Sequence, residues 1–180
     1  LYERFGIEML ATTEGALDNL RWHRAIWESG WAGRIVTTYR PDAVVDPEFE
    51  GFAENVAALG ALTGEDTGTW EGYLAAHRAR RAFFRAHGAT ASDHGHPTAR
   101  TEDLPQADAA VLFDKALRGA CSAEEAEAFR GQMLTEMARM SLEDGMVLQI
   151  HAGSWRNHSA ATFARHGRDR GFDIPTRTDY

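Results

Sequence analysis

The alternation of strand-like and helix-like segments is the feature that most restricts the fold of this chain. Four short runs are rich in β-branched or other apolar residues, and each is followed by residues with helical spacing. The runs cover residues 5–12, 34–39, 89–92 and 146–150. The last is almost wholly apolar, which is typical of a strand buried in a parallel sheet. Because alternating strands and helices build parallel sheets, we predict the α/β class.

Four strands of this kind are half of a (β/α)8 barrel of the TIM type, whose usual length is roughly 250 residues. The chain has 180 residues, so either a small open sheet or an incomplete barrel is expected. Periodicity does not distinguish these two folds. Because no repeat, low-complexity tract or linker interrupts the pattern, we expect residues 1–180 to form a single segment of one domain.

Capping signals set the expected ends of the helices. Thr13 and Asp46 are expected N-caps, and Ser122 with Glu125 forms the signature of a capping box. Glycines stand where most of the helical patterns stop. The expected helices cover residues 15–29, 47–59, 69–87, 108–118, 123–144 and 159–166.

Charge and composition exclude some classes of function. The formal net charge of −8 argues against binding of nucleic-acid phosphate, which needs a basic face. No apolar run approaches the roughly 20 residues of a membrane helix, so no membrane association is expected. Cys121 is the only cysteine, so no intrachain disulfide can form. No secretory signal opens the chain, and we expect a cytoplasmic protein.

Polar side chains follow each of the four expected strands. The carboxyl ends of parallel strands meet at one edge of a sheet, where α/β proteins place their functional residues. We therefore expect the four polar segments to face one shared pocket. They are residues 12–14, 39–42, 92–96 and 151–157.

The histidines of these segments allow more than one interpretation. His94 and His96 form a His-x-His pair that can bind a divalent metal. The pair follows its expected strand instead of lying within it, so substrate hydrogen bonding or a structural role stays open beside metal ligation. His151 ends an apolar strand, where a histidine is either a satisfied core residue or a functional one.

The arginines and the aspartate leave similar alternatives. The guanidinium forks of Arg40 and Arg156 can hold a carboxylate with two hydrogen bonds. The competing interpretation is a surface ion pair, for example between Arg40 and Asp42. Asp93 is a candidate general base, a metal ligand or a loop-shaping side chain.

At these strand ends the chain resembles the uronate isomerase (glucuronate isomerase) family, a branch of the amidohydrolase superfamily. The matching pieces occur in the family's order and at similar spacings, so the resemblance covers essentially the whole chain. They are LATTEGALDNLRWH (residues 10–23), TYRPD (38–42), SDHGH (92–96), MVLQIHAGSWRNHS (146–159) and GRDRGFDIPTRTDY (167–180).

The resemblance implies a distorted (β/α)8 barrel of more than twice this length. It also implies an aldose–ketose isomerase that interconverts D-glucuronate with D-fructuronate, and D-galacturonate with D-tagaturonate, through an enediol. By this resemblance the chain covers about strands 2 to 5 of the barrel, and we expect the isolated segment to be inactive. A homo-oligomer with a small uronate as its ligand is the expected assembly.

The family holds a divalent metal, commonly zinc, with a His-x-His pair on its first strand and an aspartate on its last. Neither element lies in this sequence, and by position His94 and His96 are not that pair. The metal ligands are therefore expected outside residues 1–180. The resemblance carries over the substrate side of the site. The expected catalytic residues are Asp93, His94 and His151, and the expected substrate-binding residues are Arg40, Arg156, Thr13 and Asn157.

One departure from the family pattern concerns the residues after Arg156. The family often continues with further asparagines, whereas His158 follows Asn157 here.

Two other functions stay open: a metal-dependent hydrolase of a small acid, and a non-catalytic module. An open half-barrel would expose strand edges and apolar surface.

Overall fold

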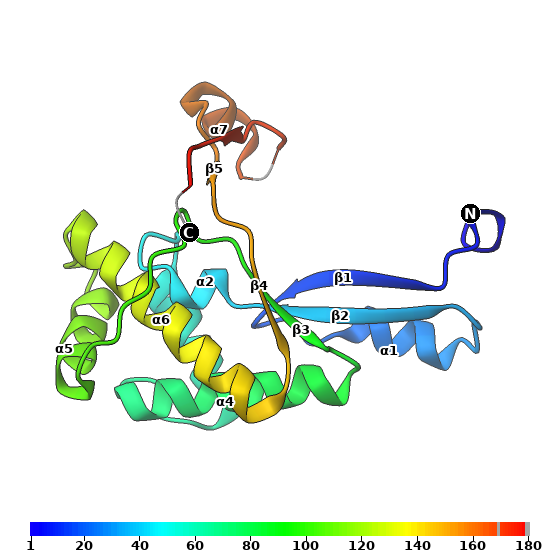
Figure 1. Cartoon of the computed structure of the whole chain (residues 1–180), viewed down its shortest axis with the longest axis horizontal. Coiled ribbons are helices and arrows are strands. Elements are labelled where there is room, and N and C mark those ends of the chain that lie inside the picture. The colour runs from blue at the N-terminus through cyan, green and yellow to red at the C-terminus, as the bar shows by residue number, and fades with distance from the viewer. Residues whose placement is uncertain (169, 179–180) are drawn as a thin grey trace.

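The computed structural model describes residues 1–168 and 170–178. Its main sheet has four parallel strands in the order β1-β2-β3-β4 (Figure 1). The predicted α/β class and parallel sheet are thus confirmed. The strands are β1 (Met9–Gly15), β2 (Arg34–Arg40), β3 (Ala91–His94) and β4 (Val147–Ile150).

Helices separate the strands along the chain. A 3-10 turn precedes the sheet, and a short antiparallel pair, β5 (Ser154–Trp155) and β6 (Ile174–Pro175), follows it. The helices are α1 (Arg21–Glu28), α2 (Asp42–Val45), α3 (Phe52–Thr63), α4 (Trp70–Ala86), α5 (Gln106–Leu117), α6 (Ala123–Asp144) and α7 (Ala160–His166). No helix in the described ranges is long and apolar enough to cross a bilayer.

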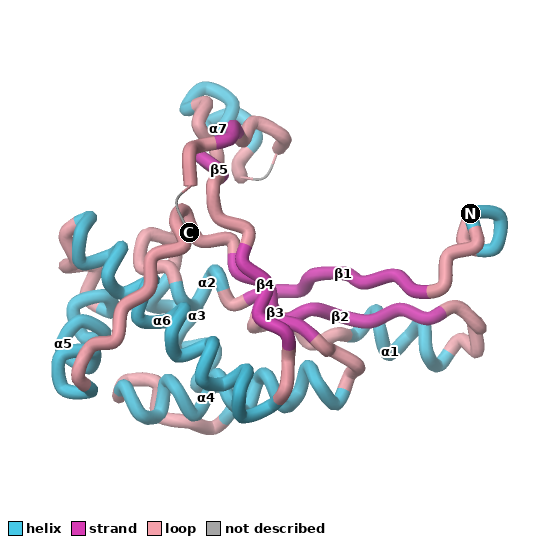
Figure 2. Tube along the Cα trace, in the orientation of Figure 1, coloured by secondary structure: helices cyan, strands magenta, loops and turns pink. Residues whose placement is uncertain are grey.

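The sheet is covered on one side only. Helices α1, α4 and α6 lie below the strands in Figures 1 and 2, whereas no described helix lies across the upper side. Apolar side chains on the strands are accordingly exposed: Met9 is 45% and Val147 62% accessible to solvent. The expectation that the fourth strand is buried on both sides is therefore wrong for this chain.

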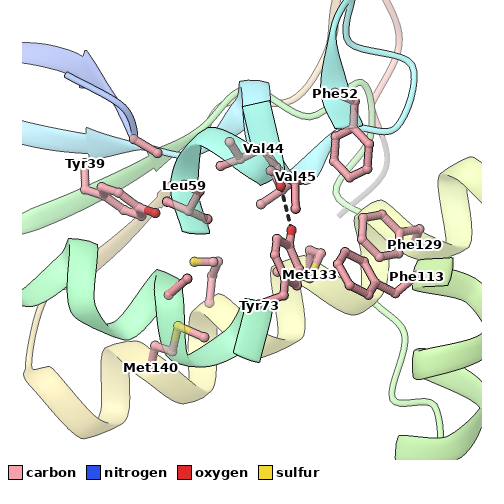
Figure 3. Packing of buried hydrophobic residues seen from close by; sticks show 14 of the residues in the cluster. Tyr39, Val44, Val45, Phe52, Leu59, Tyr73, Phe113, Phe129, Met133 and Met140 are labelled. Carbon is pink, nitrogen blue, oxygen red and sulfur yellow. Dashed lines mark hydrogen bonds between the residues drawn. The ribbon is translucent and has the colours of Figure 1, made fainter. Parts of the chain in front are cut away.

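The core lies between the helices and the covered side of the sheet (Figure 3). The Tyr73 ring stacks on Phe113 with centroids 4.4 Å apart, and its hydroxyl donates a 2.6 Å hydrogen bond to the Val44 carbonyl. Met133, Met137 and Met140 of α6 are buried against this cluster. The methionine stripe of α6 is thus core packing.

The predicted capping box is confirmed, and so is the helix start predicted at Thr69. Thr69 accepts a hydrogen bond from the Gly72 N–H at the start of α4. Ser122 and Glu125 form the reciprocal capping box of α6. At both starts a short polar side chain satisfies the otherwise unpaired N–H groups of the first helical turn.

Two predicted helix starts are wrong. Thr13 lies inside β1, which runs on to Gly15, and α1 begins only at Arg21. Asp46 does not cap a helix, because its carboxylate accepts hydrogen bonds from Arg130 Nη1 and the Glu48 N–H. A tertiary ion pair here overrides the local capping signal, and α3 starts six residues later.

Gly60 does not end α3, although the sequence predicted a stop there. The helix continues to Thr63, and Gly64 takes the left-handed backbone conformation of the cap (φ 79°). A Cβ at Gly60 would lie 2.5 Å from Thr67 Oγ1. Gly60 is therefore required by close packing against the next loop rather than by a turn.

Buried histidines make this fold sensitive to acid. His77 accepts or donates a 2.9 Å hydrogen bond with the Tyr39 hydroxyl, and burial lowers the pKa of His77 to about 3. Burial likewise lowers the pKa of His94 and of His96. Since an unfolded histidine titrates near pH 6.5, the unfolded state takes up protons first as the pH falls. Stability is therefore full above pH 6.5 and decreases below it.

We expect His77 to lower the free energy of unfolding between pH 6.5 and pH 5 by about 1.4 kcal/mol per pH unit. Urea unfolding followed by tryptophan fluorescence measures this slope. The His77→Phe variant keeps a ring but cannot titrate, so its slope should be smaller whatever its starting stability. An equal slope in both proteins would contradict the assignment to His77.

Candidate functional site

The carboxyl ends of β2, β3 and β4, with the residue after β5, bring three charged side chains together around the His151 ring. Nδ1 of His151 lies 2.8 Å from Asp93 Oδ1. Nε2 lies 3.4 Å from Arg40 Nη2 and 3.2 Å from Arg156 Nη2. Arg40, Asp93 and His151 are far apart in the sequence, and the parallel strands place them side by side, while Arg156 follows His151 by five residues.

The partners of the His151 ring determine where its proton lies. A guanidinium group can only donate hydrogen bonds, so Nε2 accepts from Arg40 and Arg156. The ring proton of the neutral imidazole is therefore on Nδ1, where the Asp93 carboxylate accepts it. An imidazole oriented by a carboxylate, with a lone pair on its second nitrogen, is the arrangement of a general base.

Two carboxylates hold Arg40 in place. Its Nε donates to Asp42 Oδ2 at 2.7 Å, and its Nη1 lies 3.8 Å from Asp93 Oδ2. Asp42 in turn accepts a hydrogen bond from the Gly95 N–H. The Arg40–Asp42 ion pair that the sequence suggested as an alternative is present, and it belongs to the same cluster as His151.

Gly95 allows this cluster to be compact. A Cβ on Gly95 would lie 2.5 Å from Arg40 Nη2, 2.8 Å from Asp42 Oδ2 and 2.8 Å from His151 Nε2. Only a residue without a side chain leaves room for these three polar groups.

A cavity of about 280 Å³ opens beside the cluster. Arg40, Asp42 and Arg156 form one part of its wall, while His96, Phe49 and Arg168 form another. A second hollow lies next to it, lined by Arg156 and Asn157 among others. Concave sites with a few convergent polar groups are where small ligands bind.

Four of the expected site residues thus lie together, namely Arg40, Asp93, His151 and Arg156. Asn157 lies near them in the second hollow, and its backbone N–H donates to Asp173. Thr13 is exposed on β1, which is an edge strand of the sheet. It is not among the residues that line the cavity.

His94 lies on the opposite side of β3 from Asp93. The strand runs to His94, so the prediction that this histidine follows the strand is wrong. Successive side chains of a strand point to opposite faces, and the fully buried His94 ring pairs with Ser92 Oγ at 3.1 Å. Its side chain is therefore part of the helix-facing interior and does not reach the His151 cluster.

The residues present do not form a metal site. No group of three or more His, Cys, Asp or Glu side chains within the described ranges is arranged to hold an ion. His94 and His96 pack edge to face with ring centroids 5.7 Å apart.

The sequence alone did not indicate that several further residues belong to the site. Gly95 stood within a quoted motif, but no pattern showed how closely other groups approach it. Phe49 and Arg168 were not expected to lie together in the site, because the contact between positions so distant along the chain leaves no periodic signal. His96 was considered only together with His94, as a metal pair or as a substrate-bonding or structural residue.

These features define an α/β protein with a polar site, built around an aspartate–histidine pair, at the carboxyl ends of its parallel strands. The family model for glucuronate isomerase matches residues 1–179. The chain therefore belongs to the glucuronate isomerase family.

The curated relatives that the chain matches are uronate isomerases. Those of Mesorhizobium japonicum and Rhizobium meliloti are 66% and 65% identical to it over 180 residues, which are 100% of this chain and 38% of each relative. The chain thus spans less than two-fifths of the length of these relatives.

Solved structures of the family have the same fold over this stretch. The crystal structure of glucuronate isomerase from Caulobacter crescentus superposes with a TM-score of 0.95 at 53% identity, covering 99% of this chain and 37% of that one. Uronate isomerase from Thermotoga maritima gives a TM-score of 0.92 at 30% identity, covering 98% and 40%.

Proposed function

We propose that this chain supplies the proton-transfer part of a uronate isomerase, which interconverts D-glucuronate and D-fructuronate, and D-galacturonate and D-tagaturonate. The observation that carries the proposal is the His151 ring held between Asp93 and two guanidinium groups, and the two arginines, Arg40 and Arg156, line a cavity. The family membership and the curated relatives support the same activity.

The reaction needs a base that moves a proton between two adjacent carbons. In an aldose–ketose isomerisation the proton on the carbon beside the carbonyl group is removed, the hydroxyl proton of that carbon moves to the carbonyl oxygen through an enediol, and the first proton is added to the former carbonyl carbon. His151 Nε2 is the acceptor for this proton, and Asp93 stabilises the imidazolium that forms. Arg40 and Arg156 donate hydrogen bonds to the oxygen atoms on which negative charge develops.

We further propose that the sheet is part of a (β/α)8 barrel completed by residues outside this chain. The uncovered side of the sheet, with Met9 and Val147 exposed, would then face the barrel interior. The edge strands β1 and β4 would pair with the missing strands, since unpaired edges invite such pairing. The zinc expected from the family resemblance would have its ligands in that other part.

The test compares two polypeptides: residues 1–180 alone, and the longer polypeptide that carries them. We expect the longer one to convert D-glucuronate to D-fructuronate and the short one to show no turnover. Product formation is followed by NMR of the sugar. Absence of uronate turnover by the correctly folded longer polypeptide would overturn the proposed activity. Turnover by residues 1–180 alone would overturn the proposal that the site needs residues outside this chain.

A further inference from the structure

Arg130 of helix α6 is a buried cation surrounded by three carboxylates. The residue is only 5% exposed. Its Nη1 donates hydrogen bonds to Asp46 at 2.8 Å and to Glu48 at 2.7 Å, and its Nη2 donates to Glu127 at 2.7 Å. Burial alone would lower the pKa of Arg130, but the three carboxylates raise it above its ordinary value. The guanidinium group is therefore charged and held by each of its partners.

The partners of Arg130 come from two places in the chain. Glu127 lies one turn earlier on α6, whereas Asp46 and Glu48 belong to the turn between α2 and α3. Within that turn the Asp46 carboxylate also accepts the Glu48 N–H, and the Asp46 carbonyl accepts the Phe49 N–H at 2.9 Å. Arg130 thus ties to α6 a turn whose own hydrogen bonds fix Phe49.

The turn of residues 46–49 is part of the wall of the cavity. Asp46 and Phe49 line this cavity, whereas Arg130 is outside the set of described residues that line it. Glu127, the partner on α6, accepts a hydrogen bond from Thr98, which lines the neighbouring hollow. The cluster around Arg130 therefore holds both the segment that follows β2 and the segment that follows β3.

Loss of the Arg130 charge would release this turn. Three carboxylates that share one guanidinium group would then face one another without a cation, and like charges in a partly buried site repel. The Glu48 side chain is 59% exposed, so it can turn into the solvent. The turn would then move away from α6, and Phe49 would move with it.

We propose that Arg130 is a positioning residue of the isomerase, which fixes the cavity wall by holding the turn of residues 46–49 against α6. This inference rests on the proposed uronate isomerase activity and concerns the fit of the substrate. The chemical step depends on other contacts, because the His151 ring is held by Asp93, Arg40 and Arg156.

Steady-state kinetics of the longer polypeptide with the Arg130→Gln substitution tests the proposal. We expect KM for D-glucuronate to rise about 10- to 100-fold, because groups that contact the substrate are displaced. We expect kcat to change by less than about threefold, since the base keeps its own partners. Arg130→Lys keeps the charge without the planar fork, so it should recover part of the lost KM effect.

Arg139→Gln is the matched control on the same helix. Like Arg130, Arg139 pairs with a glutamate three residues earlier and with a carboxylate distant in the sequence, Glu136 and Asp103 respectively. Both of these partners are outside the set of described residues that line the cavity. The control should therefore leave KM and kcat unaltered.

Hydrogen exchange of the longer polypeptide, followed by mass spectrometry, tests the tether without any turnover. The N–H groups of Glu48 and Phe49 are bonded within the turn. They should exchange at least about tenfold faster in Arg130→Gln, because the turn opens more often once it is detached from α6. Exchange of residues 93–95 should stay the same.

The thermal unfolding midpoint shows whether Arg130→Gln folds. Should it fail to fold, Glu127→Gln replaces it, because this change removes one charge of the cluster and leaves Arg130 paired with Asp46 and Glu48. KM should then rise by several-fold, and an unchanged KM would overturn the inference.

An unchanged KM in folded Arg130→Gln would overturn the inference, as would a loss confined to kcat or equal exchange of the turn in both proteins. Each of these results leaves the isomerase activity standing. Absence of turnover in the unmodified polypeptide would instead refute the proposed function and, with it, the role of Arg130 in substrate fit. Faster exchange of the turn would in that case still establish the tether.

Discussion

Replacing Asp93 with Asn should lower kcat for D-glucuronate by roughly 100- to 10,000-fold, the usual contribution of general acid–base catalysis. The Asp93 carboxylate accepts the Nδ1 proton of His151 at 2.8 Å and lies 3.8 Å from the Arg40 guanidinium. An amide of the same shape removes the charge that stabilises the imidazolium. If its NH2 group turns toward Nδ1, the ring proton is forced onto Nε2, where two guanidinium groups already donate hydrogen bonds.

His151→Asn should lower kcat by a similar factor. The double variant should have a kcat no lower than that of either single variant. Residues that act as one unit show such non-additive losses, because removing one partner already disables the other. Steady-state kinetics of the longer polypeptide measures all three factors. The control is Asp103→Asn on the surface, where the carboxylate pairs with Arg139, and this change should leave kcat unaltered.

Multiplied losses in the double variant would mean that Asp93 and His151 act independently, which is incompatible with a hydrogen-bonded base. Retention of more than a tenth of the activity in Asp93→Asn would also contradict the proposed role. Both results are distinguishable from unfolding by the thermal unfolding midpoint of each variant.

Local chemistry explains why much of the fold was predictable. Helix α6 starts at a capping box and ends at a left-handed glycine, Gly145, and both signals act within a few residues. The strands were predicted from short apolar runs, which tertiary packing reinforces. Where the prediction of helix starts was wrong, at Thr13 and Asp46, the competing partner was distant: strand β2 in the first case and Arg130 in the second.

At the site, some features follow from the order of strands and helices in the sequence, whereas others depend on the three-dimensional register of the strands. That polar groups gather at the carboxyl ends of parallel strands follows from topology, and Arg40, Asp93, His151 and Arg156 do lie together. Which side of β3 a residue faces depends on the strand register, and a shift of one residue exchanges the faces. The sequence therefore could not separate Asp93, which contacts His151, from His94, which is buried under the sheet.

The Gly95→Ala variant should lose at least about 100-fold in kcat/KM, the cost expected when catalytic groups are displaced by about an ångström. The backbone of Gly95 does not lie in the left-handed region, so alanine is compatible with its conformation. The added methyl group would lie 2.5 Å from Arg40 Nη2 and 2.8 Å from His151 Nε2. At least one of these groups must move, and the contact between them is then lost.

Gly15→Ala is the matched control for this effect. Gly15 pairs with Arg40 across the β1–β2 ladder, but a Cβ there would meet nothing within 4 Å. Gly15 also lines the cavity, so we expect some loss, but a much smaller one than in Gly95→Ala, because the same methyl group displaces no protein atom. If Gly95→Ala were as active as Gly15→Ala, the Arg40–His151 contact would not be required for turnover. The arrangement around His151, on which the assignment of the base depends, would then be wrong.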